Sequence, residues 1–271
     1  MPPIDLTNKP IAITGASAGI GLATALACAR AGMPVALAAR REDLLRDAVA
    51  KITASGGRAI AVVCDVTKPG DCARLIDETI RAFGSIHAVF ANAGYGVECK
   101  AHEMTDQALR DIFECNFYGT LNTIRPALPH FLAQKRGHVL ICSSAMSKVT
   151  IPLMFAYAAT KSAQDHLGRA MRIELESAGV NVSTIHPIGT HTEFSKVLLE
   201  KGGGKPRSAE TSVRFKQTPE QVADAIVACL RRPKGEVWTS LPTRLLIALG
   251  TACPPLADAI LRRRFRTRGG A

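Results

Sequence analysis

The stretch Thr14-Gly15-Ala16-Ser17-Ala18-Gly19-Ile20-Gly21 links a short apolar run to an alanine-rich segment. The run at 10–14 predicts a buried strand, and the segment at 20–31 predicts a helix. Glycines in such a turn allow positive φ and let the backbone approach a phosphate group, towards which the helix N-terminus points its N–H groups. The stretch therefore predicts a dinucleotide-binding turn, with a tight turn that binds no ligand as the alternative. The predicted phosphate-binding residues are Gly15, Ser17, Gly19, Ile20 and Gly21.

Apolar runs and helical segments alternate along the rest of the chain. Nearly continuous apolar strands separated by helices are typical of a parallel sheet that is covered on both faces. We therefore predict an α/β fold, a Rossmann-type doubly wound and mostly seven-stranded parallel sheet with helices on both faces. After the first strand and helix, the expected strands are 34–39, 58–64, 86–91, 137–143, 180–185 and a short one at 235–239; the expected helices are 42–54, 69–83, 105–134 (in two pieces around Pro126) and 155–178.

Composition and charge exclude several classes of protein. Of the 271 residues 47% are hydrophobic and 21% are charged, which excludes a disordered or fibrous chain. The formal net charge is +11, but aromatic residues do not interleave with the basic clusters, so we expect no nucleic-acid partner. None of the eight cysteines form a C-x-x-C pair, which favours a reducing cytoplasm and gives no sign of a metal site. No signal peptide or 18-residue apolar span is evident.

Two segments stand apart from the alternating pattern. Residues 190–217 contain three consecutive glycines and follow a strand, which favours a lid over a substrate site; the alternative is a plain surface loop. We assign residues 1–243 to one nucleotide-binding domain that includes this lid. Residues 244–271 form an apolar, arginine-rich helical extension. We expect the extension to pack over the substrate pocket or a neighbouring subunit, and peripheral contact with an anionic membrane is the alternative.

The end of the second predicted strand indicates which dinucleotide is bound. An enzyme that prefers NAD carries an acidic residue there, which binds the ribose 2′-hydroxyl. This chain has Arg40 and Arg41 instead, and guanidinium groups suit a 2′-phosphate. The pair therefore favours NADP (NADPH) over NAD. Alternatively, Arg41 serves only the next helix and Arg40 acts alone.

Tyr157 and Lys161 lie four residues apart, on one face of a predicted helix. A cation roughly 4 Å from a phenol contributes about 4 kcal/mol at an effective dielectric of about 20, which is enough to bring the phenol pKa near neutrality. Such a tyrosine can exchange protons with a substrate. The alternative is a surface lysine beside a half-buried tyrosine. Ser144, with Ser143 as a rival, ends the strand before this helix.

Taken in order, these residues closely resemble the short-chain dehydrogenase/reductase family, in its short single-domain branch. The resemblance covers about residues 9–240. It departs from the family pattern at Ile188, where a glycine usually follows the proline, and in lacking a basic residue inside the glycine-rich turn. The motifs that carry it are Thr14-Gly15-x-x-x-Gly19-x-Gly21, Asn92-Ala93-Gly94, Asn116, Ser144, Tyr157-x-x-x-Lys161 and Pro187-x-x-x-x-Thr192.

The resemblance implies four catalytic residues. Tyr157 exchanges a proton with the substrate oxygen, and Ser144 hydrogen-bonds that oxygen. Lys161 holds the nicotinamide ribose and lowers the pKa of Tyr157. Asn116 holds a water molecule that links Lys161 to solvent.

The resemblance also implies further cofactor contacts. Asp65 and Val66 lie at the adenine, and Asn92, Ala93 and Gly94 shape the adenosine side. Tyr157, Lys161, Pro187, Ile188 and Thr192 lie at the nicotinamide end.

The expected activity is the NADP(H)-dependent interconversion of a carbonyl and a secondary alcohol by hydride transfer. A catalytically idle NADP-binding sensor or scaffold, or a membrane-surface protein that uses its basic extension, is the alternative. The resemblance implies a homodimer or homotetramer built through the helices at 105–134 and 155–178. Apolar residues around the expected site favour a lipophilic substrate; they are Tyr95, Met146, Val149, Ile151, Leu153, Met154, Phe155 and Phe194.

Overall fold

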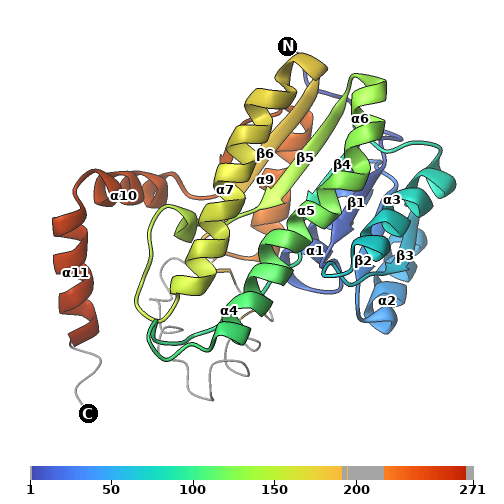
Figure 1. The fold of residues 1–271 in the computed structure, drawn as a ribbon. Helices are drawn as coiled ribbons and strands as arrows, with labels where there is room; N and C mark the ends of the chain where they lie inside the picture. The colour runs from blue at the N-terminus through green and yellow to red at the C-terminus, as the bar shows by residue number, and fades with distance from the viewer. Residues whose placement is uncertain (1, 191–193, 195–216, 267–271) are drawn as a thin grey trace.

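The computed structural model describes residues 2–190, 194 and 217–266. Within them, seven strands form one sheet in the order β3-β2-β1-β4-β5-β6-β7, and every neighbouring pair is parallel (Figure 1). The predicted Rossmann-type sheet, including its short seventh strand, is confirmed. The strands are β1 (Ile11–Thr14), β2 (Val35–Ala39), β3 (Ala59–Val63), β4 (Ala88–Ala91), β5 (Gly137–Cys142), β6 (Val180–His186) and β7 (Glu236–Trp238).

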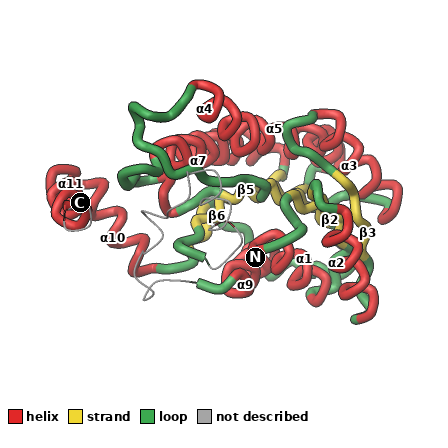
Figure 2. Tube along the Cα trace, turned by 90° about the horizontal axis from the view of Figure 1, so that it is seen from below, coloured by secondary structure: helices red, strands yellow, loops and turns green. Residues whose placement is uncertain are grey.

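Helices cover both faces of the sheet (Figures 1 and 2). One hydrophobic core joins the sheet to α1 (Gly19–Arg30), α2 (Glu42–Ala54) and α9 (Pro219–Arg231). A second core joins the opposite face to α3 (Pro69–Phe83), α5 (Gly119–Ile124), α6 (Leu128–Gln134) and α7 (Phe155–Leu175). Ile11 and Ile13 belong to the first core and Ala12 to the second, so the strands are apolar without interruption because both faces are buried.

The strand order reverses at β1, and this reversal creates the binding edge. Ile11 of β1 is in register with Val35 of β2 on one side and with Ala88 of β4 on the other. The chain after β1 and the chain after β4 therefore turn to opposite faces of the sheet, which leaves a crevice beyond the strand carboxyl ends. The predicted phosphate-binding turn and the Asn92-Ala93-Gly94 segment lie at this edge.

The long helical stretch at 105–134 is more divided than the predicted two pieces. It begins as α4 (Asp106–Phe113), widens to a π-helical turn at Glu114–Tyr118, continues as α5, and tightens to a 3-10 turn at Arg125–Ala127 before α6. Proline lacks an N–H group, which explains the break at Pro126. The π-helical turn contains Asn116.

The C-terminal extension leaves the body of the protein as two helices, α10 (Leu241–Ala252) and α11 (Pro254–Arg266) (Figure 1). No described residue of α10 is buried, and its large apolar side chains are mostly exposed: Leu245, for example, is 70% exposed. The described side chains of α10 are therefore not buried, although α10 lies beside the 3-10 turn at Ala145–Ser147. Packing over the substrate pocket or against a neighbouring subunit stays a prediction. The predicted lid near 190–217 falls almost entirely outside the described residues.

Among the described residues, no single helix has the length and hydropathy of a membrane span. Residues Leu241–Ala252 and Pro254–Arg263 meet that test only when they are counted together, and a bend of 111° separates them.

Candidate functional site

The turn after β1 has the backbone that its glycines predict. Gly15 and Gly19 have φ values of 66° and 56°, a region that side chains other than glycine rarely adopt. Ala18 is the N-cap residue of helix α1 and offers no side-chain cap, and the first turn of α1 contains no acidic residue. The N–H groups and the positive dipole end of α1 are therefore left to an external anion.

Asn92 holds this turn from the neighbouring strand. Its Nδ2 donates to the carbonyl oxygens of Thr14 at 3.0 Å and Gly15 at 3.3 Å, and its backbone N–H donates to Thr14 Oγ1 at 3.2 Å. A Cβ atom on Gly21 would collide with the Gly15 carbonyl oxygen and lie 2.7 Å from Asn92 Nδ2. Asn92 thus braces the phosphate turn, a role that the sequence reasoning missed because the bond joins segments far apart in the chain.

The basic pair after β2 lies beside the same turn. Arg41 Nη2 donates a hydrogen bond to Ser17 Oγ at 3.0 Å, and Arg41 makes no side-chain cap bond to α2. Arg40 is exposed, and its charge acts on Tyr95, whose pKa burial raises to about 12. The structure therefore brings Arg41 to the phosphate turn, which counts against the alternative in which Arg41 serves only the next helix.

Asp65 and Val66 follow β3 at the same edge. The Asp65 carboxylate accepts hydrogen bonds from the N–H and hydroxyl of Thr67, at 3.1 and 2.8 Å. Val66 is buried with its side chain against Gly119, and its carbonyl oxygen accepts a bond from Asn122 at 2.9 Å. Asp65 and Val66 therefore hold the loop after β3 in place through these contacts.

Ser144 and Tyr157 are brought together where β5 ends and α7 begins. Ser144 Oγ accepts a bond from the Met146 N–H at 3.1 Å and is hydrogen-bonded to the Tyr157 side chain. The Tyr157 ring is half-buried and lies 5.2 Å from the ring of Phe194. The rival Ser143 instead donates its hydroxyl to the Lys161 carbonyl at 3.0 Å. Ser144 is therefore the one of these two serines that contacts the Tyr157 side chain.

Lys161 is buried one helical turn after Tyr157. Its Nζ donates to the Cys142 carbonyl oxygen at 2.7 Å and lies 5.5 Å from the centroid of the Tyr157 ring. Burial raises the pKa of Tyr157 and lowers that of Lys161. Burial therefore outweighs the lowering of the Tyr157 pKa that the spacing of the two residues predicts.

Asn116 connects three parts of the site from the π-helical turn. Its Oδ1 accepts from the Tyr95 N–H at 2.9 Å, and its Nδ2 donates to the Tyr95 carbonyl at 2.9 Å and to Thr160 Oγ1 at 3.0 Å. A Cβ atom on Gly94 would lie 3.0 Å from Asn116 Oδ1 and 3.6 Å from Lys161 Nζ. The Asn92-Ala93-Gly94 segment, Asn116 and Lys161 therefore meet at one point.

The segment after β6 closes the other side of the site. The Pro187 carbonyl accepts from the Ala145 N–H at 3.0 Å, which ties this segment to the Ser144 turn. The Ile188 carbonyl accepts from Thr190 Oγ1 at 2.7 Å. Thr192, the last predicted cofactor contact, lies outside the described residues.

A separate apolar cluster lies beside Tyr157. Val97, Ile112 and Ala156 form its buried centre, and Tyr95, Phe155 and Tyr157 are among the partly buried residues packed against it. The sequence did not predict that residues from 97–113 contribute to this cluster. Apolar residues just after the Asn92-Ala93-Gly94 segment were the signal that could have found them.

The comparisons with known proteins agree with this geometry. The family model for short chain dehydrogenases matches residues 9–202. An uncharacterized oxidoreductase of Listeria monocytogenes is 35% identical over 84% of this chain and 93% of its own length. 11-beta-hydroxysteroid dehydrogenase A of Arachis hypogaea is 30% identical over 98% of this chain and 78% of its own. The chain belongs to the short-chain dehydrogenase/reductase family of oxidoreductases.

Two solved structures share the fold. A short-chain dehydrogenase/reductase of Burkholderia phymatum in complex with NAD superposes with a TM-score of 0.85 at 24% identity, over 94% of this chain and 96% of its own. An alcohol dehydrogenase of Thermococcus sibiricus complexed with 5-hydroxy-NADP gives 0.74 at 28% identity, over 85% and 95%. Fold neighbours thus bind either dinucleotide, and the uncapped α1 and the glycine-lined turn of this chain suit the phosphates of both.

The close approach at Gly21 gives a test of the phosphate turn. Replacing Gly21 with Ala places a Cβ against the Gly15 carbonyl, so we expect NADPH and NADH each to bind at least about tenfold more weakly, a loss of about 1.4 kcal/mol, in isothermal titration calorimetry. Gly70→Ala is the control, since an added Cβ there meets nothing within 4 Å. Unchanged affinity in a folded Gly21→Ala protein would exclude this turn as the phosphate site.

Proposed function

We propose that the protein is an NADP(H)-dependent oxidoreductase that interconverts a carbonyl and a secondary alcohol. The observation that carries this proposal is the meeting of Ser144, Tyr157 and Lys161 at the sheet edge that also holds the glycine turn. A scaffold that only bound the dinucleotide would not need a buried lysine behind a tyrosine paired with a serine. This argues against the idle sensor or scaffold.

Each of the three side chains has a distinct task in this proposal. When it is bound, the nicotinamide supplies or accepts the hydride. Tyr157 gives its phenol proton to the carbonyl oxygen in reduction and takes it back in oxidation. Ser144 donates a hydrogen bond to the same oxygen and so fixes its position next to the phenol. Lys161 holds the ribose hydroxyls and stabilises the phenolate left when the proton departs.

Asn116 is proposed to complete a proton path from Lys161 to solvent. Its backbone carbonyl oxygen accepts bonds from Gln164 Nε2 at 2.7 Å and from Thr120 Oγ1 at 2.8 Å, which ties Asn116 to both neighbouring helices. Gln164 Oε1 is buried without a hydrogen-bond partner, so it is an acceptor beside Asn116 that a water molecule would satisfy.

The preference for NADP over NAD rests on the position of Arg41. Its guanidinium is 3.0 Å from Ser17 Oγ, beside the turn and at the end of β2 where the adenosine ribose of a doubly wound fold is bound. Arg40 precedes it and is exposed. Two guanidinium groups favour a 2′-phosphate, and we propose that Arg41 is the principal contact.

A lipophilic substrate is supported by the apolar surroundings of Tyr157. The cluster centred on Val97, Ile112 and Ala156 lies on one side, and Phe194 covers the ring on another. The name of the Arachis relative describes a steroid dehydrogenase, and steroids are substrates of this apolar kind. In such a site the apolar side chains bind most of the substrate surface, and a few polar groups fix the orientation of the substrate.

We propose assembly into a homodimer or homotetramer through the outer helices at 105–134 and 155–178. Large apolar side chains are exposed on this face: Tyr118 is 50% exposed, Leu132 45% and Ile173 69%. Burying such a face between subunits removes the apolar surface from water.

The exposed face of the extension is proposed to contact an anionic membrane surface from the cytoplasm. Leu241, Leu245, Leu246, Leu249, Leu256 and Ile260 are each more than half exposed. Arg244, Arg262 and Arg263 lie among them, and the chain as a whole carries +11. The apolar side chains and flanking arginines of this extension complement a negatively charged lipid surface. They complement a second copy of this chain less well, because that copy carries the same positive charge.

The first test concerns cofactor choice. Arg41→Asp should weaken NADPH binding by about 1.5–3 kcal/mol, because a charged hydrogen bond to the 2′-phosphate is lost, and should change NADH binding little. Arg40→Asp should act in the same direction. Arg46→Asp, an equal change of charge at an exposed site on α2, is the control. Tighter NADH than NADPH binding by the unaltered protein would overturn the preference.

The second test concerns the proton donor. Tyr157→Phe should abolish ketone-dependent oxidation of NADPH, measured by absorbance, while NADPH affinity stays within about twofold, since only the proton is removed. Lys161→Ala should weaken both turnover and NADPH binding because Lys161 also holds the ribose. Wild-type turnover in Tyr157→Phe would remove this residue from the mechanism.

The third test concerns the extension. The protein should co-sediment with phosphatidylserine vesicles and not with phosphatidylcholine vesicles, and salt should weaken the binding. Leu245→Ser combined with Leu249→Ser should abolish it, whereas Val63→Ser, which alters an exposed residue of β3, should not. If the double variant instead changes only the oligomeric state, the face belongs to a subunit interface.

A further inference from the structure

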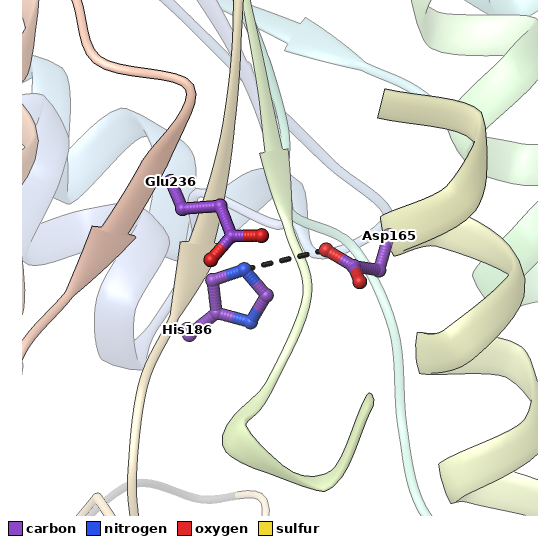
Figure 3. A group of neighbouring side chains, drawn as sticks. All are labelled: Asp165, His186 and Glu236. Atoms are coloured by element: carbon purple, nitrogen blue, oxygen red, sulfur yellow. Dashed lines mark ion pairs between the residues drawn. The ribbon is translucent and has the colours of Figure 1, made fainter. Parts of the chain in front are cut away.

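A buried charged network lies directly behind Ser144. Its members are His186 at the end of β6, Asp165 on α7, Glu236 on β7 and Lys148 just after the Ser144 turn. Figure 3 shows the His186 ring beside the Glu236 carboxylate, with its ion pair to Asp165. The proposed chemistry uses none of these four residues, yet they join the elements that carry Ser144, Tyr157 and Lys161.

Lys148 supplies the positive charge that the carboxylates require. Its Nζ lies 2.5 Å from Asp165 Oδ2 and 3.2 Å from Glu236 Oε1. Burial opposes the charged form of Lys148, but hydrogen bonds to both carboxylates raise its pKa. Asp165, His186 and Glu236 have the spacing of metal ligands, with ligand atoms within 4.8 Å of one another. The ammonium group pairs with both carboxylates, offsets one of their two negative charges and would repel a metal cation, so we interpret the cluster as an ion-pair network.

His186 is held in one orientation by contacts on every side. Its ring stacks on Trp238 with centroids 4.6 Å apart and an interplanar angle of 9°, and Trp238 Nε1 donates to Glu236 Oε2 at 2.8 Å. Nε2 lies 3.1 Å from Thr184 Oγ1 and 3.4 Å from Asp165 Oδ1. Burial alone would raise the pKa of Asp165, but bonds from His186 and Lys148 outweigh it and lower the pKa to about 2, so this carboxylate is a permanent acceptor.

The other ring nitrogen reaches the catalytic serine. His186 Nδ1 lies 3.1 Å from the Ser144 carbonyl oxygen and 3.3 Å from Ser147 Oγ. A carbonyl oxygen only accepts hydrogen bonds, so this contact with Ser144 is a hydrogen bond when Nδ1 carries the hydrogen. Beside it, the Ala145 N–H donates to the Pro187 carbonyl at 3.0 Å. With Nδ1 protonated, two bonds hold the peptide groups of the Ser144 turn against the end of β6.

We propose that His186 is a positioning residue that fixes the Ser144 hydroxyl through the Nδ1–H bond to the Ser144 carbonyl, with Asp165, Lys148 and Trp238 holding the ring. The clamp sets the distance between the serine turn on β5 and the tyrosine on α7, because Asp165 lies on the same helix as Tyr157. Without the clamp the serine turn can shift, and a misplacement of about 1 Å near the reacting atoms can cost about 100-fold in rate.

Two substitutions separate the two nitrogens of the ring. The side-chain amide of His186→Asn occupies the place of Nδ1 and keeps a donor for the Ser144 carbonyl. The amide of His186→Gln occupies the place of Nε2 and leaves that carbonyl without its donor. We expect kcat for NADPH-dependent reduction of a long-chain methyl ketone to fall roughly 10- to 100-fold in His186→Gln and less than about threefold in His186→Asn. NADPH affinity should stay within about twofold in both.

Controls separate this role from general stability. His102→Gln makes the same replacement at an exposed position outside the helices proposed as the subunit interface and should leave kcat and the thermal midpoint unchanged. Equal loss of kcat in the Asn and Gln variants, or no loss in either, would overturn the proposal. So would a loss of NADPH affinity that parallels the loss of kcat.

A measurement on the unaltered protein keeps the proposal testable if either variant fails to fold. Nitrogen-15 NMR of the histidine side chains should show His186 Nδ1 protonated in the absence of any substrate, and an unprotonated Nδ1 would refute the clamp. The inference rests on the proposed function, but the two can fail separately. Absence of turnover in the unaltered protein counts against the function, whereas the NMR result speaks only of the clamp.

Discussion

The parallel pairing of β1 with both β2 and β4 is the constraint on which the site depends. It places the carboxyl ends of β1, β4, β5 and β6 at one edge, and the chain direction then dictates which loops meet there. Asn92 can brace the phosphate turn only because β4 lies next to β1. The pairing of β4 with β5 places Ser144, which follows β5, at the same edge. The pairing of β5 with β6 brings the Pro187 carbonyl, which follows β6, to the Ala145 N–H.

Several features could be predicted from the sequence because they arise from local patterns. Strands buried on both faces are uninterrupted apolar runs, as in β1, where Ile13 faces one core and Ala12 the other. A glycine turn before an alanine-rich helix predicts a phosphate-binding turn without reference to the rest of the chain. Tyr157 and Lys161 share a helix face through spacing alone. The family resemblance added the roles of Ser144 and Asn116, which spacing does not reveal.

The parts that could not be predicted depend on partners distant in the chain. Asn116 lies in a π-helical turn and is hydrogen-bonded to Tyr95 and to Thr160 on another helix. Nothing near Asn116 in the sequence predicts this π-helical turn. In isolation His186 resembles an ordinary structural histidine. Its place behind Ser144 follows from the pairing of β5 with β6, and its acidic partner comes from α7. Lys161 was expected to act on Tyr157 through charge, but its burial cannot be read from a four-residue spacing.

Burial shifts the pKa values of Tyr157 and Lys161 in opposite directions. It disfavours the phenolate of Tyr157 and the ammonium of Lys161 alike, so the pKa of the first rises and that of the second falls. At neutral pH Tyr157 therefore keeps its proton, which is the form that the proposed reduction of a carbonyl consumes. The hydrogen bond with Ser144 acts against burial by lowering the Tyr157 pKa. In the proposed mechanism, a serine held at the right distance acts on the acid as well as on the substrate, which gives a physical reason for the proposed clamp of the Ser144 turn by the buried His186 ring.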